Sequence, residues 1–150
     1  MAKKSTSKKS SSVFGNIIII SICATVFLHF CHQDKASLFN AMKSGEAYSV
    51  SSIRLARDYH SNEVNADNKY KDKLLQVTGK VYEISKDVTD DTVISLQGTD
   101  MFQRVNAYLL YDDDEIAPTL KKGNHIKIRC YGDGEVIGSP MLRDCIFIEY

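Results

Sequence analysis

The stretch Leu74–Ile84, LLQVTGKVYEI, decides the fold that this sequence predicts. Apolar and polar residues alternate along it, and one face carries, in order, Leu75, Val77, Gly79 and Val81. This two-residue period predicts a half-buried β-strand. A glycine inside a strand has no side chain to pack and often marks a bend. We therefore expect the strand to bend at Gly79 and to pair with different partners at its two ends.

Four further strands are expected after this one. They cover Val93–Leu96, Arg104–Tyr111, His125–Tyr131 and Met141–Glu149, with polar turns between them. Residues 112–123, DDDEIAPTLKKG, begin with acids and end with lysines and a glycine, which is the charge pattern of a helix. Pro118 keeps this helix short, and it falls between the third and fourth strands.

A short helix is expected before the central strand. Ser51 can cap a helix that runs to about His60, whose apolar stripe would comprise Ile53, Leu55, Ala56 and Tyr59. One or two further turns are expected within Asn62–Tyr70, with Val64 and Ala66 facing inward.

These elements predict a mainly β protein built on a five-stranded Greek-key barrel. Three strands, a helix and two strands form the order of the OB-fold, with the helix between strands three and four. An immunoglobulin-like sandwich would need about seven strands and no helix at that position, so it fits less well.

The N-terminal region predicts a membrane anchor. Residues 1–12 contain four lysines and many serines, which predicts a disordered basic tail. Residues 13–31 contain no Asp, Glu, Lys or Arg, and as a helix they would span about 28 Å, close to the ~30 Å hydrocarbon core. We therefore expect a single-pass transmembrane helix at 13–32, a spacer at 33–50 and the OB-fold domain at 51–150.

A cleaved signal peptide is the alternative to an anchor. The apolar segment ends without a small-x-small cleavage site, and Ile22 and Phe30 stand where a lipoprotein signal needs a small residue before its cysteine. An uncleaved signal-anchor is therefore favoured. The lysines keep the N-terminus inside the cytoplasmic (inner) membrane, which predicts a domain in the periplasm or at the cell exterior.

The charge of the domain argues against nucleic acid as its partner. From residue 33 onward, 15 Lys and Arg stand against 19 Asp and Glu, so the domain carries about −4. Domains that follow a phosphate backbone are usually basic. The expected partners are the membrane, through residues 13–32, and an envelope protein.

Three runs resemble one family. They are NEVNADNKYKDKLLQVTGKVYEI, IAPTLKKGNHIKIRCYGDG and LRDCIFIE, within Ser51–Glu149. They resemble the tRNA_anti-like family of small OB-fold domains, which often follow a membrane anchor or a lipoprotein signal. The most specific run is NE-x-x-AD-x-KY-x-x-K, at Asn62–Lys73. The resemblance implies the fold and its topology, and because the family has no established function it implies no site residues.

The usual ligand face of an OB-fold barrel predicts the candidate binding residues. That face comprises strands two and three with the loops that join strands one to two and four to five. Here it would contain the loops Lys86–Thr92 and Gly132–Pro140 and the side chains Ser95, Arg104, Asn106 and Tyr108. Arg and Tyr can stack on a nucleotide or a sugar, although the same residues suit an ordinary solvated face.

No catalytic, metal or cofactor site is expected. The acidic run at Asp112–Glu115 lacks EF-hand spacing and suits the start of a helix. His29 and His32 flank Cys31 without a recognised zinc spacing. No nucleophile motif, HExxH or phosphate-binding loop is present in the sequence.

Cys130 and Cys145 are a candidate disulfide. They fall in the last two predicted strands, and their midpoint lies between Ile137 and Gly138, where a hairpin would turn. An oxidising compartment lets such a pair persist. The alternative is two buried free thiols, since cysteine also packs as a small apolar residue.

The sequence therefore predicts a membrane-anchored OB-fold module that binds or interacts and is not an enzyme. A nucleic-acid-binding OB domain is the alternative. A structural docking component of an envelope complex is a further one.

Overall fold

The computed structural model describes residues 36–100, 102–110 and 116–150. Residues Leu38–Tyr150 form one compact unit, which holds the strands and helices named below. The predicted tail and anchor, residues 1–32, lie outside the described residues. Among the residues that are described, no helix is both long and apolar enough to cross a membrane.

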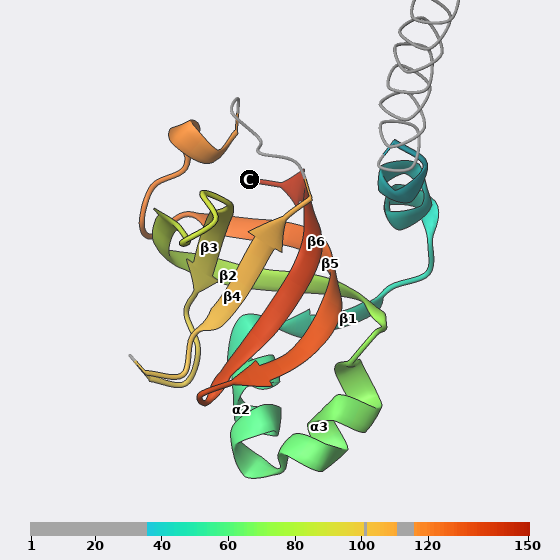
Figure 1. The fold of residues 1–150 in the computed structure, drawn as a ribbon, viewed down its shortest axis with the longest axis vertical. Helices are drawn as coiled ribbons and strands as arrows, with labels where there is room; N and C mark the ends of the chain where they lie inside the picture. The colour runs from blue at the N-terminus through green and yellow to red at the C-terminus, as the bar shows by residue number, and fades with distance from the viewer. Residues whose placement is uncertain (1–35, 101, 111–115) are drawn as a thin grey trace, which may run out of the picture. The chain divides into compact units, whose positions relative to one another are not determined.

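Five strands close into a barrel, as the sequence predicts (Figure 1). They are β2 (Leu74–Lys86), β3 (Thr92–Leu96), β4 (Val105–Leu109), β5 (His125–Val136) and β6 (Ser139–Glu149). The order around the barrel is β2-β3-β4-β6-β5, and β5 returns to β2. Only β4 and β6 run parallel among these five pairings. This is the strand order of the OB-fold.

The long strand β2 changes partner halfway, and this prediction is confirmed. Residues 74–80 pair with β5, whereas residues 81–86 pair with β3, with an irregular register between Val81 and Glu83. Gly79 lies at the change. A Cβ on Gly79 would lie 2.7 Å from Ser52 Oγ and 3.1 Å from Leu96 Cδ1. The glycine therefore lets the helix that begins at Ser52, earlier in the chain, start close against the strand.

Part of the predicted spacer is a structural part of the barrel. Residues 36–44 are helical, and β1 (Tyr48–Ser51) joins the sheet parallel to β2. Met42 is fully buried in a second small core with Leu110 and Ile146. Arg129 Nη1 donates to the carbonyl oxygens of residues 42, 43 and 45, at 2.7, 2.7 and 3.1 Å. The structured domain therefore begins before residue 51, because this segment buries apolar side chains of its own.

Two helices, α2 (Ser52–Ser61) and α3 (Glu63–Tyr70), lie beside each other at one end of the barrel (Figure 1). Their buried apolar side chains are Leu55, Ala56, Tyr59, Ala66 and Tyr70, which pack with the side chains inside the barrel. Ser51 caps α2 as predicted, since its Oγ accepts from the Arg54 amide at 3.2 Å. The segment predicted as one or two turns is a helix of eight residues.

The prediction that Ile53 and Val64 face inward is wrong. Ile53 is 41% exposed and Val64 is 74% exposed. In α2 the buried positions are 52, 55, 56 and 59, spaced as i, i+3, i+4 and i+7, so Ser52 takes the place expected for Ile53. Ser52 is tolerated there because its hydroxyl donates to the Gln97 carbonyl at 2.6 Å.

The helix predicted between the third and fourth strands is a single 3-10 turn, η1 (Ala117–Thr119). Pro118 lies at its start and allows only this one turn in the described part of the segment. Leu120, directly after the turn, is buried against the barrel core.

The prediction of a loop at Gly132–Pro140 is wrong, because β5 and β6 form one long hairpin through these residues. β5 runs to Val136 and β6 begins at Ser139, so the turn consists of Ile137 and Gly138 with φ of 50° and 78°. Two positive φ values are typical of a type I′ turn. The turn lies midway in sequence between Cys130 and Cys145, where the hairpin turn was predicted.

A disulfide joins Cys130 and Cys145 inside the barrel, with an S–S distance of 2.08 Å. The two residues are 0% and 2% exposed. Leu142 and Cys145 both point into the central core. In a regular strand, residues three apart would face opposite sides of the sheet. Asp144, with φ of 54°, lies where the β5–β6 register shifts, so a bulge turns Cys145 inward.

Candidate functional site

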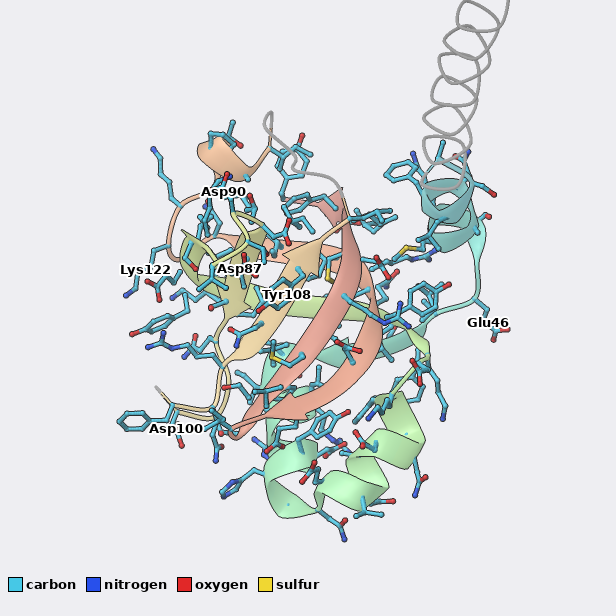
Figure 2. All side chains as sticks on the ribbon, in the orientation of Figure 1. Glu46, Asp87, Asp90, Asp100, Tyr108 and Lys122 are labelled. Carbon is cyan, nitrogen blue, oxygen red and sulfur yellow. A yellow bond between two sulfur atoms is a disulfide. The ribbon has the colours of Figure 1, made fainter. Side chains whose placement is uncertain are left out.

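The outer face of β3 and β4 brings two of the four predicted binding residues together. Ser95 Oγ and Asn106 Oδ1 lie 2.8 Å apart across the two strands, and Asn106 Nδ2 lies 3.8 Å from Met141 Sδ on β6. Ser95 is only 8% exposed. Tyr108 lies one step further along this side of β4 (Figure 2). The polar groups in the middle of this face are therefore bound to one another.

Arg104, the fourth predicted residue, contacts a different partner. Its guanidinium carbon lies 3.7 Å from the ring centre of Tyr82 on β2, and Lys122 Nζ lies 4.2 Å from the same centre. Arg104 Nη1 also binds Glu83 at 3.1 Å. Sequence reasoning missed Tyr82 and Lys122, although Tyr82 was visible as an aromatic residue on the polar face of the central strand.

The acids of the β2–β3 turn bind their own loop. Asp87 Oδ1 accepts from the amide and hydroxyl of Thr89, at 2.8 and 2.7 Å, and from the Asp91 amide at 3.0 Å. The Thr89 hydroxyl lowers the pKa of Asp87. Asp87 and Asp90 lie toward the end of the barrel next to η1 (Figure 2). Because these bonds occupy the carboxylate of Asp87, Asp87 holds the turn in shape and is not a candidate ligand-binding group.

The described residues contain no group of three or more His, Cys, Asp or Glu side chains that could hold a metal ion. The acidic run at residues 112–115 and the His/Cys group at residues 29–32 lie outside them.

A hydrogen-bond network on α2 and α3 centres on Asp58. Its carboxylate accepts from Tyr70 OH at 2.6 Å, Lys69 Nζ at 2.9 Å and Arg54 Nε at 3.1 Å. Burial alone would raise the pKa of Asp58, but the bonds from Tyr70, Lys69 and Arg54 outweigh it and lower the pKa from 3.8 to about 2. Asp58 is therefore ionised at neutral pH and fixes both helices.

A second bond ties the same helices together. Tyr59 OH donates to Asp67 Oδ1 at 3.1 Å. Burial, and then this carboxylate, raise the pKa of Tyr59. Asn62 caps α3, since its Oδ1 accepts from the Asn65 amide at 3.0 Å. Residues of the run Asn62–Lys73 therefore cap α3 and tie it to α2.

A groove of about 470 Å³ lies along β1, bordered by the start of α2 and the end of α3. Three of the residues that line it are basic, namely Arg54, Arg57 and Lys69, and none is acidic. Tyr48, 49% exposed, packs edge-on against Tyr70 with ring centres 5.8 Å apart. Lys69 Nζ lies 5.6 Å from the ring centre of Tyr48. Hydrogen bonds with Tyr70 and Asp58 raise the pKa of Lys69, so it remains charged.

Sequence reasoning missed this groove for two reasons. Its residues are spread from Tyr48 to Tyr70 and show no motif. The strand that brings them together, β1, falls in the segment that was predicted to be a spacer.

Comparison with known proteins agrees with this architecture. The tRNA_anti-like family model matches residues 8–146. The fold is similar to the crystal structure of a "putative nucleic acid-binding lipoprotein" from Klebsiella pneumoniae, with a TM-score of 0.56 and 16% identity over 73% of this chain and 97% of that chain. No curated protein matches the chain at a significant level. The family match spans nearly the whole sequence, and the chain belongs to the tRNA_anti-like family.

Proposed function

We propose that this chain is a membrane-anchored binding and interaction module and not an enzyme. Residues 13–32 act as a single-pass signal-anchor in the cytoplasmic membrane, with the N-terminus inside and the barrel in the periplasm or at the cell exterior. The four lysines that precede an uncharged segment of membrane-spanning length support this orientation.

One observation carries the proposal, namely the open, basic groove along β1 on a barrel whose carboxylates at positions 58, 67 and 87 hold structural neighbours. Asp58, Asp67 and Asp87 each accept hydrogen bonds from structural neighbours. A catalytic acid or base needs to reach a substrate, and these carboxylates are occupied in holding helices and turns. The groove, in contrast, offers charge, an aromatic ring and strand edge to another molecule.

The anchoring and the orientation are tested on intact spheroplasts that contain the full-length chain. External protease is expected to cleave the barrel domain before lysis, whereas a cytoplasmic marker protein stays intact. A barrel that is cleaved only after lysis contradicts the orientation. A chain that is recovered without detergent contradicts the anchor.

The interaction role is tested by purifying the full-length chain from its own membranes in mild detergent. One partner is expected to co-purify in a fixed ratio, and an unrelated single-pass protein with the same tag serves as the control. The absence of any stoichiometric partner, in repeated preparations, counts against an interaction module.

A nucleic-acid-binding OB domain is the second candidate. The stacking of Arg104 and Lys122 on Tyr82 favours it, and the structural neighbour carries a nucleic-acid-binding description. The domain charge of about −4 and the ion pair between Arg104 and Glu83 oppose it. Retention on single-stranded DNA that falls steeply with salt, and that Tyr82→Ala abolishes, would rank this candidate first.

A further inference from the structure

The outer edge of β1 is open. β1 ends the sheet order and pairs with β2 alone among the described strands. Three of its four residues, Tyr48, Ser49 and Ser51, are exposed. Among the turn, loop and cap hydrogen bonds of the described residues, none involves the backbone of residues 48–50. An edge strand of this kind presents free N–H and C=O groups that can accept one more strand.

The charges beside this edge select the type of strand. Arg54 and Lys69 share one carboxylate, Asp58, at 3.1 and 2.9 Å. Arg57 is exposed and has no side-chain partner among the described residues. Three cations and one carboxylate leave the groove with a net charge of about +2, on a domain of about −4. The groove is therefore a local exception that attracts an acidic segment.

Apolar surface in the groove adds a second preference. Tyr48 is 49% exposed and Ile53 is 41% exposed, and both line the groove. Side chains of an added strand alternate between two faces. A segment that alternates acidic and apolar residues could therefore set its acids near the cations and its apolar residues on Tyr48 and Ile53.

We propose that the groove along β1 binds an acidic, extended segment of a partner protein as an added β-strand. This inference rests on the proposed interaction function and names the class of partner for the groove. β1 has four residues, so the paired segment covers about 13 Å at ~3.3 Å per residue. Backbone pairing supplies affinity, and the cations with Tyr48 supply selectivity.

Single-stranded nucleic acid is a less suitable occupant of this groove. A phosphate backbone can accept from N–H groups, but it has no N–H donors for the C=O groups of a strand edge. The net negative charge of the domain also opposes a long polyanion, whereas a short acidic peptide meets only the local cations.

The probe is a short fluorescent peptide that alternates Glu and Val, and binding to the full-length chain in mild detergent is followed by anisotropy. Binding is expected to weaken with salt and to be lost when Lys replaces Glu in the peptide. Arg57→Glu should weaken it by about tenfold or more. Lys121→Glu makes the same change of charge outside the groove at an exposed position and should have little effect. Equal melting temperatures for the two variants show that both are folded.

Backbone pairing is tested with two further peptides, each methylated on one set of alternate amide nitrogens. Added-strand binding requires one set of amides and not the other, so one methylated peptide should lose binding and the other should keep it. Binding of both peptides, or no effect of Arg57→Glu, overturns the inference. Displacement of the peptide by an oligonucleotide of equal charge also overturns it, in favour of a general polyanion groove.

Co-purification of the native partner with the Arg57→Glu variant distinguishes a failure of this inference from a failure of the proposed function. A stoichiometric partner that is lost with Arg57→Glu supports both. A partner that survives Arg57→Glu overturns the added-strand inference and leaves the interaction module standing.

Discussion

The outer face of β3 and β4 and the groove along β1 differ in how their polar groups are paired. On the first, Ser95 binds Asn106, and Arg104 binds Glu83 while it stacks on Tyr82. In the second, cations outnumber carboxylates and a strand edge stays open. Fold class alone would direct attention to the first region. The comparison teaches that the groups left without partners, rather than the architecture, locate the better candidate site.

The largest effect is expected from Gly132→Ala, which should displace the end of α3 that borders the groove and leave the β3–β4 face unchanged. A Cβ on Gly132 would lie 2.2 Å from the Tyr70 carbonyl oxygen, at the end of α3. Because backbone must move, we expect a loss of about 3 kcal/mol or more in the free energy of unfolding. Urea denaturation measures the loss, and hydrogen exchange should show it concentrated in α3.

Gly138→Ala is the matched control, since it adds the same methyl group where nothing lies within 4 Å. Its positive φ of 78° should cost only about 1 kcal/mol. Equal losses for the two variants would show that α3 does not press on Gly132.

Loss of the disulfide should weaken both regions together, because β5 and β6 belong to the barrel that both share. Cys130 and Cys145 are 15 residues apart, and closing a loop of that length stabilises by about 3 kcal/mol. Reductant should lower the free energy of unfolding of the wild type by that amount, which urea denaturation measures as a lower midpoint. Thiol labelling of the unreduced, denatured chain should find no reactive cysteine in residues 33–150. Two labelled thiols there would mean that the bond does not form.

Asp58→Asn should weaken the helices that border the groove, by about 2 kcal/mol at neutral pH. The folded pKa of Asp58, about 2, lies below its ordinary value of 3.8. Its contribution is therefore fully present above pH 3.8 and is lost as the pH falls toward 2. Urea denaturation between pH 2 and 7 should show this dependence in the wild type and a weaker one in Asp58→Asn.

Asp87→Asn, in the β2–β3 turn, provides the comparison for Asp58. Asparagine keeps an Oδ1 that can accept the Thr89 and Asp91 bonds, so little loss is expected at neutral pH. If Asp58→Asn behaves like this turn variant at every pH, the Asp58 network does not hold α2 and α3.

The smallest effect is expected at the β5–β6 turn, which belongs to neither region. Ile137 is 97% exposed and has φ of 50°, a conformation that a β-branched residue adopts at a cost. Ile137→Asn should therefore stabilise the barrel by about 1 kcal/mol and raise its melting temperature. Peptide binding should stay the same. A lower melting temperature would show that the isoleucine makes stabilising contacts.

Short-range patterns predicted most of the barrel. Alternation in Leu74–Ile84 identified β2 and its buried face, and the order of elements identified a five-stranded barrel. Ser51 as a helix cap was also evident. The position of the hairpin turn followed from the spacing of Cys130 and Cys145. These features depend on neighbours in the chain or on one strand pair, so a linear pattern records them.

The candidate site could be predicted only in part. Ser95, Asn106 and Tyr108 do share the expected face, but their spacing could not reveal that Ser95 and Asn106 bind each other. The partner of Arg104, Tyr82, lies 22 positions earlier in the chain and on another strand. Which polar groups remain unpaired depends on contacts between distant segments, and no local period reports them.

The three-dimensional arrangement alone decided the role of residues 36–50. The apolar side chains at 38, 39 and 42 looked like an extension of the anchor or a spacer, yet they pack on β5 and β6. Tyr48–Ser51 is too short for a reliable strand pattern, and it becomes a strand because β2 offers it an open edge. Composition and periodicity were sufficient for the barrel because burial acts on each strand separately. The groove needed three elements to meet, and tertiary packing brings them together.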